Sequence, residues 1–283
     1  MKRQSFILRL GKEDRVIRGD VFTKAEQAAP TLIICHGFKG FKDWGFFPYA
    51  AESLAKQGFT VITFNFSMNG VGEELFHFTE LDKFARNTYS REQEDLALLF
   101  HSLRERALPL TEAIDTHRLG LIGHSRGGGN SLLYAFEDTA IRSVVTWNGI
   151  SDVDIFPPDI KKQMQIHGAA LIPNARTGQQ MPIQKEVLDD IEANHSRFNI
   201  IERLASFNRP LLIIQGEADQ PRLVEGAHKM AATAPKATLE ILKGANHTFG
   251  AVHPFKGTTP DLEKALERTA SFFHETLSHI KSQ

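Results

Sequence analysis

Short apolar runs separated by stretches of helical periodicity dominate the chain. The runs are rich in leucine, β-branched and aromatic residues, and they occupy residues 31–37, 59–66, 118–124, 141–149, 210–217 and 237–244. Runs this short and this continuous are typical of parallel strands that are buried on both faces of a sheet. Residues 5–10 and 15–22 surround a polar turn, which predicts an antiparallel hairpin at the start of the chain.

Helical patterns lie between the predicted strands. Apolar residues recur at the spacing of one helical face in residues 46–57, 90–108, 128–138, 223–234 and 261–280. Regular alternation of strands and helices favours an α/β fold: a mostly parallel, twisted sheet of about eight strands with helices on both faces. The 283 residues are enough for one large domain, 1–283.

Two stretches interrupt this alternation. Residues 151–207 are long and polar, with helical pieces but no clear strand, and we interpret them as a cap inserted over the sheet. Residues 67–89 form a second long irregular stretch. Loops of such length inside a compact domain are usually functional.

Composition narrows the class of protein. The formal net charge is -1, which does not favour nucleic acid as a partner. The chain shows neither a secretion signal nor an apolar stretch long enough to span a membrane, so we expect a cytoplasmic protein. Its single cysteine, Cys35, lies in an apolar run and is expected to be a buried, inert thiol. No metal or other cofactor is expected. The sequence neither predicts nor excludes a homodimer.

The clearest chemical signal is Gly123-His124-Ser125-Arg126-Gly127, between a predicted strand and a predicted helix. Gly-x-Ser-x-Gly in that context is typical of a nucleophilic serine on a sharp strand-to-helix turn. Small residues on both sides let neighbouring backbone pass closely. The side chain of His124 is expected to point away from the reaction.

A serine nucleophile needs a base, and the base needs an acid that orients it. Asp219 and His247 each follow a predicted strand, in the chain order Ser, Asp, His. We therefore expect a catalytic triad of these residues and Ser125. Asp152 or Asp154, after the strand at 141–149, is an alternative acid. His253 is a weaker candidate base and is expected to shape its loop.

The expected oxyanion hole is formed by two backbone N–H groups, those of Phe38 and Arg126. Phe38 lies in the segment His36-Gly37-Phe38-Lys39-Gly40 after the first inner strand, and Arg126 follows the serine. The Arg126 side chain is expected to form a salt bridge near the pocket. The expected substrate pocket is lined by Phe38, Trp147 and three residues of the cap: Phe156, Met164 and Ile166.

The segments HGFKG, GHSRGG, GEAD and GANHTF resemble the oxyanion loop, nucleophile elbow, acid loop and histidine loop of the α/β-hydrolase superfamily. Within it, the chain is most similar to dienelactone-hydrolase-like and cinnamoyl or feruloyl esterase-like proteins. It differs from dienelactone hydrolases proper, which have a cysteine where this chain has Ser125. The resemblance implies an α/β-hydrolase fold and a serine hydrolase that cleaves small-molecule carboxylic esters through an acyl-enzyme. A peptidase or amidase of the prolyl-oligopeptidase type and a non-catalytic ligand-binding protein are the alternatives.

Overall fold

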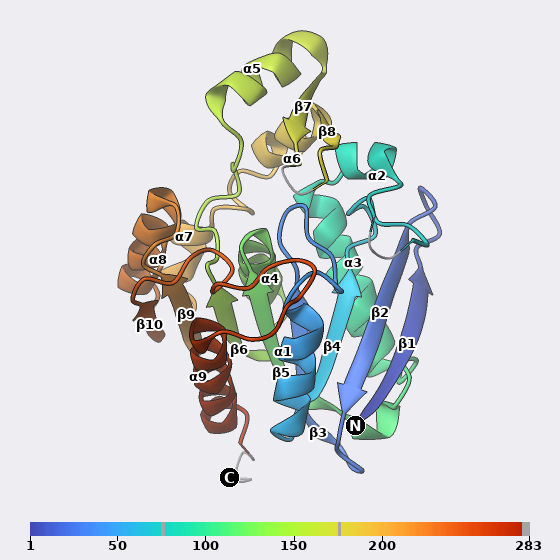
Figure 1. Ribbon diagram of the computed structural model, residues 1–283, viewed down its shortest axis with the longest axis vertical. Helices are drawn as coiled ribbons and strands as arrows, with labels where there is room; N and C mark the ends of the chain where they lie inside the picture. Colours follow the sequence, from blue (N-terminus) through green and yellow to red (C-terminus); the bar gives the residue numbers. More distant parts are fainter. Residues whose placement is uncertain (75–76, 175–176, 279–283) are drawn as a thin grey trace.

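One sheet contains all the strands that the sequence predicts. The computed structural model describes residues 1–74, 77–174 and 177–278. In these residues the sheet strands are β1 (Lys2–Arg9), β2 (Val16–Thr23), β3 (Ala29–Cys35), β4 (Thr60–Asn65), β5 (Ile114–His124), β6 (Ile141–Trp147), β9 (Leu211–Gly216) and β10 (Ala237–Leu242). They pair in the order β1-β2-β4-β3-β5-β6-β9-β10 (Figure 1).

The pairing confirms a mostly parallel sheet. β2 runs antiparallel to both β1 and β4, so the predicted hairpin is present at one edge. All other neighbouring strands are parallel. β4 and β9 are buried along their whole length, because helices cover both faces. This burial explains why apolar and polar residues do not alternate strictly along these strands, as they would in strands with one face in solvent.

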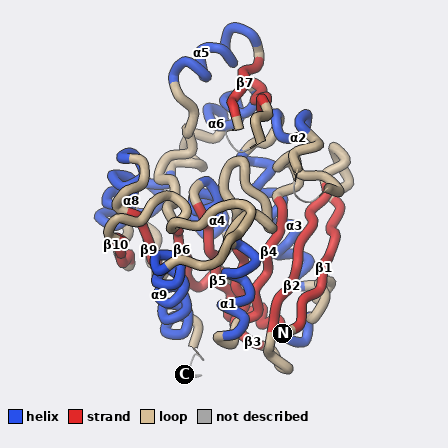
Figure 2. Tube along the Cα trace, in the orientation of Figure 1, coloured by secondary structure: helices blue, strands red, loops and turns tan. Residues whose placement is uncertain are grey.

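Helices form a layer on each face of the sheet (Figures 1 and 2). On one face lie α1 (Phe47–Lys56) and α9 (Pro260–Thr276), whose apolar residues belong to one core cluster. On the other face lie α3 (Tyr89–Arg104), α4 (Arg126–Glu137) and α8 (Pro221–Thr233), which contribute to a second cluster. Within the described ranges, no helix has the length and apolarity needed to cross a membrane.

The stretch between β6 and β9 holds more regular structure than the sequence predicts. It contains α5 (Pro158–His167), β7 (Ala169–Pro173), β8 (Gln180–Gln184), α6 (Glu186–Ala193) and α7 (Ile200–Leu204). β7 and β8 form an antiparallel hairpin, although no strand was expected there. Gly168, at φ 78°, ends α5 in a left-handed conformation and leads directly into β7.

The described part of residues 158–193 forms a lobe at the top of Figure 1, above the carboxyl ends of the parallel strands. α7, in contrast, packs against α4 and α8 of the main body. In the stretch expected to be irregular, residues 67–89, the described part contains the short helix α2 (Leu81–Ala85), which contacts β8 of the lobe. The space between lobe and sheet is where loops from distant parts of the sequence meet (Figure 2).

Candidate functional site

Ser125 occupies a sharp turn between the last residue of β5 and the first residue of α4. Its backbone angles are φ 56° and ψ -122°, a combination that L-residues seldom adopt. Such strain costs about 1–3 kcal/mol and is usually found at functional positions. Hydrogen bonds hold the turn: the Ser125 N–H donates to the carbonyl of Trp147 at 3.0 Å, and its carbonyl accepts from Gly128 and Ile150.

The glycines around Ser125 are required by close backbone contacts. A Cβ atom on Gly123 would lie 2.1 Å from the carbonyl oxygen of Gly127, and one on Gly127 would lie 2.2 Å from that of Cys35. A Cβ atom on Gly37 would lie 3.0 Å from the Cβ of Ser125, so the loop after β3 lies directly beside the serine. The motif therefore packs three backbone segments closer than any other residue allows.

We predict that Gly123→Ala destabilises the fold by at least about 1–3 kcal/mol, because the new methyl group must displace the backbone of Gly127. The measurement is chemical denaturation followed by circular dichroism. Gly11→Ala is the matched control, since nothing lies within 4 Å of the methyl group it would add. Equal stability of the two variants would contradict the close-packing explanation.

Asp219 and His247 are paired. The Nδ1 atom of His247 lies 2.8 Å from Oδ2 of Asp219, and the other carboxylate oxygen accepts the backbone N–H of Gln220 at 2.7 Å. Burial is the largest single influence and would raise the pKa of Asp219, but the hydrogen bond and charge of His247, together with hydrogen bonds from Gln220 and Gln215, hold that pKa below its ordinary value. An ionised Asp219 therefore fixes the Nδ1–H tautomer of His247 and leaves Nε2 unprotonated.

The alternative residues make other contacts. Asp154 forms an ion pair with Lys161 at 2.6 Å, and Asp152 accepts the backbone N–H of Asp154 at 2.9 Å. The Nδ1 atom of His253 accepts the N–H of Gly45 at 2.9 Å, in the role of a loop-shaping residue. Geometry therefore favours Asp219 as the partner of His247.

The side chain of Arg126 lies in a buried polar network behind the turn. Its Nε atom donates to Glu92 at 2.9 Å, and its guanidinium lies 3.8 Å from the ring centroid of Tyr89. Asn130 and Asn87 donate to the same Glu92 carboxylate, at 2.7 Å and 2.8 Å. The salt bridge expected for Arg126 is present, and it anchors the start of α4.

We predict that Glu92→Gln lowers the free energy of unfolding by about 3–5 kcal/mol, because it leaves the buried Arg126 guanidinium without its carboxylate. Whichever way the glutamine amide is turned, its nitrogen would meet a donor nitrogen that now binds the carboxylate. Glu137→Gln is the control, since its partner Arg197 is 40% exposed and such pairs contribute at most about 1 kcal/mol. Denaturant titration measures both variants, and a similar small loss in each would refute the prediction.

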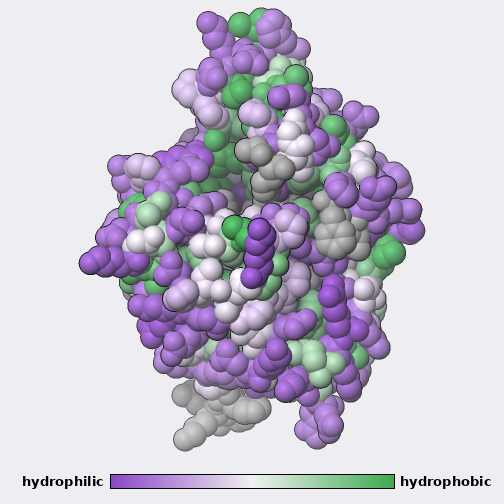
Figure 3. All heavy atoms as spheres, viewed as in Figure 1, coloured by the Kyte–Doolittle hydropathy of each residue, from purple (hydrophilic) through white to green (hydrophobic). Residues whose placement is uncertain are grey.

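A cavity of about 390 Å³ opens beside Ser125. Its lining includes Ser125, His247, Phe38 and Arg126, so the sequence-predicted catalytic and oxyanion residues except Asp219 all border it. Apolar side chains from the main body and from the stretch after β6 form much of its wall: Phe38, Trp44, Phe47, Ile150, Ile155, Phe156, Ile172 and Leu223. Figure 3 shows hydrophobic residues where the lobe joins the main body.

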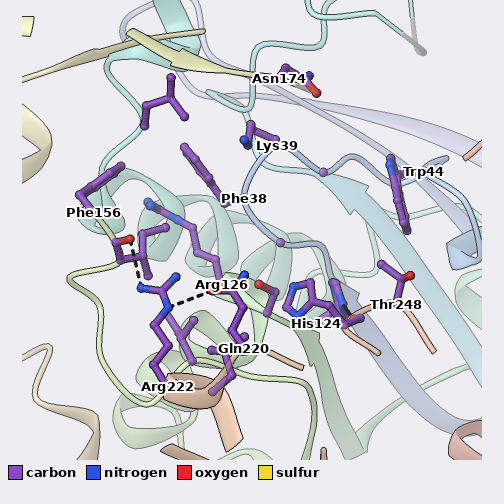
Figure 4. Close-up of a pocket in the computed structure, with 18 of the residues that line it drawn as sticks. Phe38, Lys39, Trp44, His124, Arg126, Phe156, Asn174, Gln220, Arg222 and Thr248 are labelled. Atoms are coloured by element: carbon purple, nitrogen blue, oxygen red, sulfur yellow. Dashed lines mark hydrogen bonds between the residues drawn. The ribbon is translucent and has the colours of Figure 1, made fainter. Parts of the chain in front are cut away.

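Phe38 and Phe156 line this cavity as expected. Their rings meet edge to face, with centroids 6.0 Å apart, and Figure 4 shows them side by side above Arg126. Arg222 lies below Phe156 in the same view and donates to the carbonyl of Ile155 at 3.2 Å. The sequence did not single out Arg222, because an arginine in the first turn of a helix gives no signal that it faces a cavity.

Three residues expected in the pocket lie elsewhere. Trp147 is 0% exposed and donates from Nε1 to Thr269 of α9, because its side chain points to the face of the sheet that α9 covers. Met164 is also fully buried and packs inside the lobe. Ile166 is 62% exposed, since residues two apart on α5 face opposite sides of the helix.

The expectation that His124 points away from the site is wrong. Its ring lines the cavity, and its Nε2 atom lies 2.8 Å from the backbone carbonyl of His247. Asn148, which was not among the residues expected at the site, also donates to that carbonyl, at 2.9 Å. The sequence signal that could have indicated both residues is their position. His124 ends β5 and Asn148 directly follows β6, and these two strands are neighbours in the sheet.

Two further features concern the single cysteine and the grouping of side chains that could bind a metal ion. Burial raises the pKa of the Cys35 thiol to about 12, as expected for an inert cysteine. Among the residues that the structure describes, no three His, Cys, Asp or Glu side chains come together in a group that could hold a metal ion.

Comparison with known proteins identifies the fold. A family model described as the alpha/beta hydrolase fold matches residues 30–168. An Escherichia coli protein described as an uncharacterized 31.7 kDa protein in the traX-finO intergenic region is 29% identical over 126 residues. Those residues are 44% of this chain and 39% of that protein, so the alignment covers well under half the length of the relative.

Several solved structures share the architecture over nearly the whole chain. Est1E from Butyrivibrio proteoclasticus with ferulic acid bound has a TM-score of 0.69 and 17% identity, covering 94% of this chain and 98% of that chain. The esterase domain of a Rhodothermus marinus protein has a TM-score of 0.65 and 18% identity, with 98% and 100% covered. Dienelactone hydrolase from Anabaena variabilis has a TM-score of 0.62 and 16% identity, also with 98% and 100% covered. At these identities the likeness shows the fold.

Proposed function

We propose that this chain, which has the α/β-hydrolase fold, is a hydrolase that cleaves carboxylic esters through a Ser125-His247-Asp219 triad. The observation that carries the proposal is the meeting of three features at one cavity. Ser125 stands on a strained turn at the cavity wall, His247 lines the same cavity, and His247 is paired with the buried Asp219.

In the proposed acylation step, Nε2 of His247 takes the proton from the Ser125 hydroxyl as the oxygen attacks the ester carbon. The negative charge that develops on the carbonyl oxygen is stabilised by the backbone N–H groups of Phe38 and Arg126. The intermediate then collapses: the bond between the acyl carbon and the alkoxy oxygen breaks, and His247 gives its proton to the departing alcohol.

Deacylation repeats these steps with water in place of the alcohol. His247 removes a proton from the water, the hydroxide attacks the acyl-Ser125 ester, and the acid is released as the proton returns to Ser125. Asp219 stays ionised throughout and stabilises the imidazolium that forms in each step. We propose that the apolar wall formed by Phe38 and Phe156 binds the hydrocarbon part of a small ester.

A panel of substrates tests the reaction class. We expect measurable kcat/KM values on 4-nitrophenyl esters of short acids and on methyl esters of aryl-substituted acids, such as methyl cinnamate. We expect no turnover of aminoacyl-4-nitroanilides. Turnover of the anilides with kcat/KM equal to or above that of the esters would instead support the peptidase or amidase alternative. Absence of turnover on the whole panel would favour a ligand-binding protein on the same fold.

A further inference from the structure

The backbone carbonyl of His247 accepts hydrogen bonds from two side chains. The Nε2 atom of His124 lies 2.8 Å from it, and the Nδ2 atom of Asn148 lies 2.9 Å from it. Both donors are buried, at 6% and 0% exposure. Because a buried donor without a partner costs free energy, each bond is strongly favoured once the fold forms. This carbonyl belongs to the residue whose imidazole binds Asp219.

Asn148 joins the histidine loop to two strands of the sheet. Its Oδ1 atom accepts the N–H of Gly216 at 2.7 Å, and its own N–H donates to the carbonyl of Ile214 at 2.9 Å. It adopts φ 49°, a left-handed conformation that asparagine tolerates better than most residues. Gly216 ends β9 and shortly precedes Asp219, so one side chain contacts both the strand that leads to the acid and the residue that bears the base.

His124 contacts His247 through both its ring and its Nε2 atom. The two imidazole centroids lie 4.8 Å apart. To donate to a carbonyl, His124 must carry its proton on Nε2. Burial, with the neighbouring His247 as a second cause, lowers the pKa of His124 to about 3. The ring is therefore neutral at ordinary pH and acts as a fixed donor without adding a positive charge beside His247.

We propose that His124 and Asn148 are positioning residues, which together hold the His247 backbone so that its imidazole reaches both Asp219 and Ser125. The inference rests on the proposed function. Two donors on one carbonyl oxygen restrict how the peptide plane can turn, and the ring position follows from that plane. A displacement of about 1 Å in a catalytic group can cost about 100-fold in rate. A purely structural role would affect stability and leave the rate of the folded enzyme unchanged.

Paired substitutions separate the two roles. In His124→Gln the amide nitrogen can occupy the place of Nε2, whereas in His124→Asn it can reach only the place of Nδ1. Asn148→Asp keeps the oxygen that accepts from Gly216 and removes, in its ionised form, the donor to His247. We expect kcat on a 4-nitrophenyl ester to fall by about 10- to 100-fold in His124→Asn and Asn148→Asp, with KM little changed.

His124→Gln should retain kcat to within a few-fold, and the rate of fluorophosphonate labelling of Ser125 should follow kcat in all three variants. Each variant is assayed at a temperature where circular dichroism shows it to be folded. Unchanged kcat in both His124→Asn and Asn148→Asp, with an active wild-type enzyme, would overturn the inference and leave the proposed function standing. An equal loss in His124→Gln and His124→Asn would also overturn it. An inactive, unlabelled wild-type protein would instead reject the proposed function.

Discussion

Ser125→Ala is expected to abolish ester hydrolysis, lowering kcat by about 10⁶-fold, because the proposed reaction needs the Ser125 hydroxyl to form the acyl-enzyme. The variant should fold normally, since alanine has the same Cβ atom and the hydrogen bonds of the turn use only the Ser125 backbone. Steady-state kinetics on a 4-nitrophenyl ester, together with a thermal melt, measures both properties. A folded Ser125→Ala protein that retains a tenth of the wild-type kcat would contradict the assignment of the nucleophile.

Asp219→Asn is expected to lower kcat by about 10⁴-fold at neutral pH. An amide in place of the carboxylate can donate to Nδ1 of His247 and so favours the tautomer whose Nε2 cannot accept the serine proton. The present carboxylate is buried and its pKa is held below the ordinary value, so at neutral pH it is ionised and accepts the hydrogen bond from Nδ1 of His247.

Asp152→Asn is the matched control for the acid. Asp152 was an alternative from the sequence, and its carboxylate accepts the backbone N–H of Asp154, two residues away, rather than a proton of His247. We expect its kcat to stay within threefold of wild type, a change of under about 1 kcal/mol in the barrier. A large loss in Asp152→Asn with a small loss in Asp219→Asn would reverse the assignment.

The sheet could be predicted because burial on both faces leaves a strong mark on the sequence. Every residue of β4 and β9 is buried, and aliphatic, β-branched or aromatic residues fill most of their positions. The β7–β8 hairpin escaped prediction for the opposite reason. Its exposed positions alternate with buried ones over five residues per strand, and proline and glutamine interrupt the pattern.

The pairing of His247 with Asp219 could be predicted because each residue follows a parallel strand, and parallel strands bring their carboxyl ends to one edge. The side chains that surround this pair could not be predicted in the same way. Whether Trp147 points toward the cavity or toward α9 depends on the register of one strand end. Whether Met164 or Ile166 faces inward depends on the rotation of α5 above the sheet, which packing in the lobe decides.

Intact-mass spectrometry after treatment with a fluorophosphonate tests the central claim most directly. We expect one phosphonyl adduct on the wild-type protein, located at Ser125 by peptide mapping, and none on Ser125→Ala. An unmodified wild-type protein, or an adduct on another residue, would contradict the claim that Ser125 is an activated nucleophile.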